Sequence, residues 1–219
     1  MDFGFINKFA PLYIEAGKLT LRIALIGISG AIAVGLICSL IRYFKVPIFK
    51  RIVGIYIELS RNTPLLIQLF FLYFGLPKLG IVLSSENCAV YGLIFLGGSY
   101  MSEAFRSGLE SVADIQFESG LSIGLTNFQV VKYILMPQAV TVSIPALLAN
   151  ILFLIKETSV FSAVALADLM YVAKDLIGLY YNTDEALFML VVSYAVILLP
   201  ISIVFTFTER KLRYAGFGN

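Results

Sequence analysis

Long apolar segments are the feature that most constrains how this chain can fold. A helix needs about 20 residues to cross the hydrocarbon core of a bilayer, and the apolar segments reach that length. Because lipid offers the backbone no hydrogen-bond partner, each segment must satisfy its own backbone groups, as a helix does. We therefore predict an all-α integral membrane protein with five spans, at residues of about 20–41, 52–76, 87–106, 143–163 and 186–208.

Composition leaves room for one membrane domain and little else. Of the 219 residues, 59% are hydrophobic and only 14% are charged, which is far more apolar than a soluble domain of this size. No stretch outside the apolar segments is long enough to bury a soluble core, so residues 1–219 are expected to form a single domain. The net charge of +2 is too small to indicate nucleic-acid binding.

Residues that usually carry catalysis or bind metals are scarce. The chain has no histidine, which is the commonest general base and a common zinc ligand. Cys38 and Cys88 both fall in apolar segments, where a free cysteine behaves as a small hydrophobe. We therefore expect no catalytic residue, no metal site and no disulfide framework. A membrane enzyme is the functional class that the sequence supports least.

Basic residues indicate the orientation of the chain in the membrane. One group follows the first span, and a second lies at residues 209–213, after the fifth span. Positive loops remain in the cytoplasm, so the N-terminus is expected outside and the C-terminus in the cytoplasm. Residues 1–18 are expected to lie along the interface as a short helix broken or started near Pro11. The first basic group consists of Arg42, Lys45, Lys50 and Arg51.

Small residues recur at helical spacing in two of the predicted spans. Gly27, Ala31 and Gly35 form a stripe along the first span, and Gly97, Gly98 and Ser99 are consecutive in the third. Such residues let two helices approach closely, or mark a local bend. We expect the stripe to pack within the subunit, the alternative being a seam between two subunits.

A polar stretch between the third and fourth spans has the pattern of a docking element. Residues 107–138 are predicted to form a cytoplasmic loop, and within it residues 116–138 carry apolar side chains at helical spacing. Gly124 permits a turn with positive φ or a close approach, and Pro137 is expected to stop a helix from continuing into the fourth span. The prediction is a short helix, a turn and a second helical piece. The alternative is an amphipathic loop lying on the membrane surface.

This stretch resembles the cytoplasmic signature of ABC importer permeases, E-A-A-x3-G-x9-I-x-L-P. Ser119 and Gly120 stand in place of the alanines and Met136 in place of the leucine, and all three remain small or apolar. In that family the element is the coupling helix, which inserts into a groove on the ATP-binding subunit. By this resemblance the coupling residues are Glu118, Gly120, Gly124, Ile134 and Pro137.

Two further motifs resemble the polar amino acid branch of the same family. Residues 56–68 fit Y-x-E-x-x-R-x-T-P-L-L-x-Q, and residues 156–159 fit K-[DE]-T-S. Glu58 and Arg61 are three residues apart, so a salt bridge near the cytoplasmic interface is an alternative to any role in transport. Gln68 lies deep in an apolar run and needs a partner that lipid cannot provide.

The fourth span brings an acidic residue into the membrane. If its helix is capped by Ser143, with Pro145 in the first turn, Glu157 lies about 20 Å along it. An ionisable residue at that depth is a candidate for function. The resemblance implies a solute pathway that contains Thr63, Gln68, Glu157, Thr158 and Ser159. Glu157 would bind the ammonium of an amino acid, and Thr158, Ser159 and Gln68 would bind its carboxylate.

A different start of that helix leaves an alternative open. If it begins near Ala139, Lys156 and Glu157 lie at the outer interface and pair with each other.

The resemblance implies the permease subunit of a binding-protein-dependent amino acid importer in a bacterial inner membrane. The chain lacks G-x4-G-K-[ST], so no cofactor is expected in it, and ATP and Mg²⁺ would be bound by a partner. Implied partners are two ATP-binding subunits, a second permease subunit, identical or related, an extracellular or periplasmic solute-binding protein, the amino acid and membrane lipid. The alternative is an ATP-independent channel or carrier, although an odd number of spans disfavours an inverted-repeat carrier.

Overall fold

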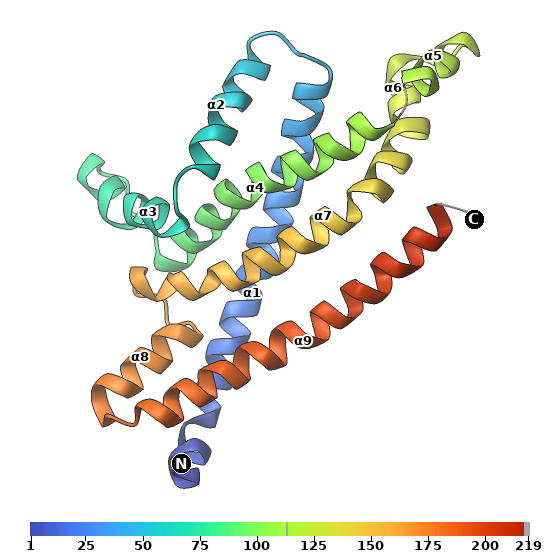
Figure 1. The fold of residues 1–219 in the computed structure, drawn as a ribbon. Coiled ribbons are helices and arrows are strands. Elements are labelled where there is room, and N and C mark those ends of the chain that lie inside the picture. The colour runs from blue at the N-terminus through green and yellow to red at the C-terminus, as the bar shows by residue number, and fades with distance from the viewer. Residues whose placement is uncertain (113, 217–219) are drawn as a thin grey trace.

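A computed structural model describes residues 1–112 and 114–216, and the described parts contain helices but no strand (Figure 1). The prediction of an all-α fold is therefore confirmed. Two π-helical segments, Phe71–Gly75 and Val131–Leu135, and two 3-10 segments, Leu76–Leu79 and Thr158–Val164, continue the α-helices. The α-helices are α1 (Phe3–Tyr43), α2 (Phe49–Arg61), α3 (Leu65–Phe70), α4 (Ser85–Ser111), α5 (Asp114–Ser122), α6 (Asn127–Val130), α7 (Met136–Glu157), α8 (Leu169–Tyr180) and α9 (Thr183–Gly216).

Within the part of the chain that the structure describes, three helical stretches are long and apolar enough to cross a membrane: Phe3–Tyr43, Asn127–Val164 and Thr183–Lys211. A shorter apolar stretch spans Leu65–Leu79. These helices fit a protein that crosses the membrane several times. The count of five spans and the orientation of the termini stay predictions.

The N-terminal residues form no separate interfacial helix. α1 runs without a break from Phe3 and contains Pro11, so the expected break near that proline was wrong. Asp2 caps the helix, because its Oδ1 accepts hydrogen bonds from the backbone nitrogens of Gly4 at 2.8 Å and Phe5 at 3.2 Å. Buried side chains on this first part of α1 pack against α8 and α9, and this packing keeps the chain helical through the proline.

The second predicted span is not one helix. α2 ends at Arg61, and α3 starts at Leu65 after a non-helical segment in which Pro64 has ψ 143°. A proline disfavours the helical conformation of the residue before it, which accounts for the break. Tyr56 and Ser60 hold α2 against α4, since both hydroxyls donate to the backbone oxygen of Phe95, at 2.7 and 2.9 Å.

The helix of the fourth span begins earlier than Ser143, so that expectation was wrong. The chain is helical from Asn127 to Glu157, and Pro137 does not interrupt it. The π-helical segment accommodates the proline: the N–H of Met136 donates to the oxygen of Val131, five residues back. The alternative of a start near Ala139 is closer to the structure, and Glu157 is the last residue of α7.

Small residues let α1 and α4 lie in direct contact along their length. A Cβ atom added to Gly27 would lie 2.8 Å from Leu93 Cβ, and one added to Gly97 would lie 2.7 Å from Ala31 Cβ. Real Cβ atoms are essentially never found this close to another atom, so a larger residue at either position would force the two helices apart. The expectation that the small-residue stripe packs within the subunit is therefore confirmed.

α7 joins this pair through polar contacts with α4. The Ser143 hydroxyl bonds to the backbone oxygen of Ala104 at 3.0 Å, and the Asn150 amide donates to the backbone oxygen of Tyr100 at 3.2 Å. In Figure 1 the α1–α2 loop and helices α5 and α6 lie toward the upper end of the molecule, whereas the N-terminus and α8 lie toward the lower end. The helices α1, α4 and α7 thus connect two ends of the molecule.

Asp168 is a fully buried N-cap of α8. Its Oδ1 accepts a hydrogen bond from the backbone nitrogen of Tyr171 at 2.8 Å, and its Oδ2 has no partner among the described residues. Burial raises the pKa of this carboxyl from 3.8 to about 7. The charged form is therefore disfavoured in the folded protein.

Substitution of Gly97 by valine should destabilise the protein by about 1–3 kcal/mol, because the side chain would separate α1 from α4. We expect a lower midpoint of thermal unfolding in detergent, followed by circular dichroism. The matched control is Gly54→Ala, since a Cβ at Gly54 meets no atom within 4 Å. Equal midpoints for the two variants would contradict the role of this contact.

Stability should fall as pH rises from 5 to 8, because the folded-state pKa of Asp168, about 7, lies above its ordinary value of 3.8. This contribution is fully present below the ordinary value and is lost as pH rises through about 7. Asp168→Asn keeps the capping oxygen without the charge, so its unfolding midpoint should depend less on pH. An unchanged pH dependence in this variant would contradict the assignment.

Candidate functional site

The predicted docking element is a knob formed by residues 114–130, that is α5, a turn and α6. A capping box starts α6: the N–H of Thr126 donates to Gln129 Oε1 at 2.8 Å, and the N–H of Gln129 donates to Thr126 Oγ1 at 3.3 Å. The structure confirms the predicted order of helix, turn and second helical piece.

Two glycines shape the knob in different ways. Gly124 has φ +88° and occupies the turn, where an added Cβ would meet no atom within 4 Å. A Cβ added to Gly120 would lie 2.8 Å from Val130 Cγ2 and 3.0 Å from Ile134 Cδ1. Gly120 is therefore needed for the close approach of α5 to the next helical segment, whereas Gly124 is needed for the turn and faces open space.

Large apolar side chains are exposed on the outer surface of the knob, among polar ones. Ile115, Ile123 and Phe128 are 63%, 77% and 72% exposed. Glu118 is also exposed, and Ile134 is half-buried beneath Gly120. Exposed apolar side chains gathered on one element mark an interaction surface. Of the predicted coupling residues, Glu118 and Gly124 are accessible on the knob, whereas Pro137 lies outside it, inside the continuous helix.

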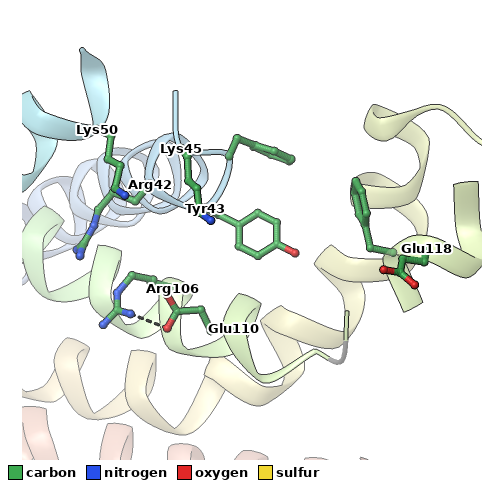
Figure 2. Close-up of a pocket in the computed structure, with 9 residues that line it drawn as sticks. Arg42, Tyr43, Lys45, Lys50, Arg106, Glu110 and Glu118 are labelled. Carbon is green, nitrogen blue, oxygen red and sulfur yellow. Dashed lines mark hydrogen bonds and ion pairs between the residues drawn. The ribbon is translucent and has the colours of Figure 1, made fainter. Parts of the chain in front are cut away.

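A chain of ion pairs fixes the ends of α1 and α4 beside the knob. Glu103 pairs with Arg42 of α1 and with Arg106, the latter at 2.7 Å, and Arg106 also pairs with Glu110 at 2.6 Å. Glu103 thus connects Arg106 of its own helix with Arg42 of a second helix. Arg42, Arg106 and Glu110 border a cavity of about 640 Å³. Figure 2 shows Glu118 across this cavity from Arg42.

A second cavity, of about 360 Å³, lies where α2, α3, α4 and α7 meet. Arg61 and Glu157 both line it. The Arg61 guanidinium lies 5.3 Å from the centre of the Tyr100 ring, and neither Arg61 nor Glu157 makes an ion pair with a described residue. The Glu58–Arg61 and Lys156–Glu157 pairs, which were left open as alternatives, are therefore not formed. The cavity offers one cation and one carboxylate, both available to a small zwitterion.

The predicted pathway residues are only partly brought together. Thr63 and Glu157 line this cavity, whereas Gln68, Thr158 and Ser159 do not. Gln68 instead bridges the break between α2 and α3, because its Nε2 donates to the backbone oxygens of Ser60 at 3.1 Å and Thr63 at 2.9 Å. Gln68 thus finds the partner that the sequence required, in a structural contact.

The hydroxyl of Thr158 is buried and donates to the backbone oxygen of Ile155 at 2.7 Å. Sequence reasoning missed Tyr100 and Phe153, aromatic residues of the cavity wall. It also gave Arg61 no role in the pathway. The motif around Pro64 was the available signal, because a helix break there ends α2 at Arg61 and exposes that residue to the cavity.

Residues 31–214 match the family model of the binding-protein-dependent transport system inner membrane component. Among similar proteins, the probable amino-acid permease protein YxeN of Bacillus subtilis is 38% identical over 162 residues, which cover 73% of this chain and 72% of that protein. The glutamine transport system permease protein GlnP of Escherichia coli (strain K12) is 28% identical over 214 residues, covering 97% and 98%.

Solved structures give the same picture of the fold. A crystal structure of an amino acid ABC transporter with histidines superposes with a TM-score of 0.88 at 28% identity, covering 96% of this chain and 99% of the other. An inward-facing methionine ABC transporter, MetNI, has a TM-score of 0.79 at 17% identity, covering 97% and 99%. The second likeness concerns the fold alone.

Gly120→Val should loosen the knob, because its side chain would overlap Val130 and Ile134. We expect faster amide hydrogen exchange in residues 115–125 than in the wild type. Gly124→Asn is the control, since asparagine tolerates positive φ and meets open space there. Unchanged exchange in the Gly120 variant would contradict the proposed close approach.

Proposed function

This chain belongs to the family of binding-protein-dependent transport system inner membrane components, and we propose that it is the translocating subunit of an ATP-driven amino acid importer. The match along residues 31–214 carries the transport function. The amino acid as solute is supported by the names of the relatives and by the Arg61–Glu157 cavity. The chain itself would catalyse no reaction.

The knob is the proposed contact with the ATP-binding subunits. Its exposed apolar residues, Ile123 and Phe128 among them, suit a groove on a protein partner. Gly124 at the turn leaves room for that partner, because glycine has no side chain and the space beside it is open. Two such subunits, one for each permease copy, would bind ATP and Mg²⁺, and their closure would move the knobs.

The Arg61–Glu157 cavity is the proposed place of the solute. Glu157 would accept hydrogen bonds from the α-ammonium. Arg61 would donate to the α-carboxylate, because the planar guanidinium can form two parallel hydrogen bonds with a carboxylate. Tyr100 and Phe153 supply aromatic walls for the rest of the solute. This assignment replaces Gln68 and Thr158 as carboxylate donors, since both use their donors on the backbone.

The remaining partners follow from the family. A second permease subunit, identical or related, would complete the pathway, and a solute-binding protein would deliver the amino acid at the outer face of the inner membrane. Transport would then consist of an exchange between inward-open and outward-open forms, biased by ATP binding at the partner subunits.

Gly124→Trp should abolish ATP-dependent uptake of amino acids by proteoliposomes that contain the permease, its ATP-binding subunit and its binding protein. The indole would project from the exposed turn, where the Cβ meets no atom within 4 Å, and would block docking. Because φ +88° also strains a tryptophan, amide hydrogen exchange should check that the knob still folds, and Gly124→Asn should retain uptake as the control. The association of the subunits should be measured on the same samples. Uptake that does not require ATP and is unchanged in Gly124→Trp would instead indicate an ATP-independent channel or carrier.

Glu157→Gln and Arg61→Gln should each raise the KM for uptake by about 10- to 100-fold, because each removes one charge-assisted contact with the solute. The control is Lys156→Gln, since Lys156 is exposed and does not line the cavity. If all three variants have the wild-type KM, the solute lies elsewhere even if transport remains ATP-driven.

A further inference from the structure

The loop between α1 and α2 is strained at two positions. α1 ends in a Schellman motif, in which the N–H of Val46 donates to the oxygen of Ile41 at 3.1 Å and the N–H of Lys45 to the oxygen of Arg42 at 3.1 Å. Lys45 therefore has φ 52°, at a position where glycine is the usual residue. The left-handed conformation of Lys45 costs conformational free energy that a glycine would not incur.

The second strained position is a γ-turn centred on Ile48. Its φ is 66° and its ψ is −57°, and the N–H of Phe49 donates to the oxygen of Pro47 at 2.7 Å. This kind of γ-turn is rare, and a positive φ is an outlier for a β-branched residue. Strained residues that persist in a fold cluster at functional sites, so an outlier of this kind raises the question of what the turn presents.

The loop presents apolar side chains to the outside. Phe44, Ile48 and Phe49 are 45%, 77% and 57% exposed. Along α2 the exposed apolar surface continues, with Ile52 at 56% and Ile55 at 62%. The tip of the loop is thus continuous with a helix face suited to lipid.

Two cations accompany these apolar groups. Lys45 and Lys50 line the 640 Å³ cavity of Figure 2 and make no ion pair with any side chain that the structure describes. The neighbouring Arg42 is already neutralised by Glu103. Of the two carboxylates bordering the cavity, Glu110 is paired with Arg106, and Glu118 lies on the opposite side from the lysines.

We propose that the α1–α2 loop is a binding site for the headgroup of an anionic phospholipid. The Lys45 and Lys50 ammonium groups contact the headgroup phosphate, and the Ile48 and Phe49 side chains sit among the upper parts of the acyl chains. Basic side chains beside apolar anchors at a membrane surface bind anionic lipid in this way. The site is distinct from the proposed solute cavity and does not depend on it.

An acidic surface of an ATP-binding subunit would also attract the lysines, but it fits the loop less well. Ile48, the most exposed of these apolar side chains, lies between the two lysines in the sequence, and the apolar face of α2 follows it directly. A phospholipid offers a phosphate to the lysines and acyl chains to the apolar side chains. The headgroup would then occupy the cavity next to the knob.

The test is native mass spectrometry of the full-length permease in detergent, titrated with phosphatidylglycerol and with phosphatidylcholine of the same acyl chains. The wild type should retain phosphatidylglycerol preferentially. Lys45→Gln combined with Lys50→Gln should weaken its retention by roughly tenfold or more, because each cation near an anionic headgroup contributes about fivefold. Lys78→Gln combined with Lys174→Gln, two exposed lysines far from the loop in sequence, is the matched control and should behave as wild type.

Ile48→Gly separates anchoring from strain, since glycine accepts positive φ. This variant should have a higher midpoint of thermal unfolding and yet retain phosphatidylglycerol more weakly than wild type. Equal retention by wild type and the Lys45/Lys50 variant would overturn the proposal, as would full displacement of the lipid by inorganic phosphate, which would indicate a site for the free anion. The Lys45/Lys50 variant should also be compared with wild type in complex with the ATP-binding subunit. If the variant loses that subunit while its lipid retention is unchanged, the proposal is overturned and the lysines contact a protein.

Discussion

The close contact between α1 and α4 is the interaction on which the rest of this structure depends. In lipid there is no hydrophobic force between helices, so association relies on van der Waals packing and on polar contacts. Glycine and alanine at Gly27, Ala31 and Gly97 let the two backbones approach. One end of the pair is then fixed by the Arg42–Glu103 ion pair, and α7 is attached along α4 by the Ser143 and Asn150 hydrogen bonds.

The frame of packed helices α1, α4 and α7 connects the two candidate sites. α4 carries Tyr100, which borders the Arg61–Glu157 cavity, and one helical turn later Glu103, which belongs to the ion pairs beside the knob. The helix that begins within the knob at Asn127 continues to Glu157, which lines the same cavity. A force applied to the knob therefore acts on helices that form the cavity. The strained α1–α2 loop lies at the same end as the knob, where membrane lipid would contact the frame.

The sequence predicted the parts of the fold that depend on local chemistry. The helix, turn and helix of the knob, the turn at Gly124 and the intrasubunit packing of the small-residue stripe were all foreseen, because spacing and glycine conformation determine them. The continuity of helix through Pro137 was missed, because the π-helical segment that absorbs the proline depends on tertiary packing. The placement of Arg61 and Glu157 on one cavity was missed because it requires the break at Pro64 and the contact of α2 with α4, and neither is visible in residue spacing alone.

We expect the knob to move as one body with α4, because buried residues of both pack in one cluster, and ATP binding would in this way be transmitted to the cavity. The most direct measurement is the distance between spin labels at Ser119, in the knob, and Asn87, near the start of α4, after replacement of Cys38 and Cys88 by alanine. Double electron–electron resonance on the reconstituted complex would compare samples with and without an ATP analogue. The account predicts one unchanged distance within each permease subunit while the knobs of two subunits change their separation. A shift in the intrasubunit distance on ATP binding would contradict it.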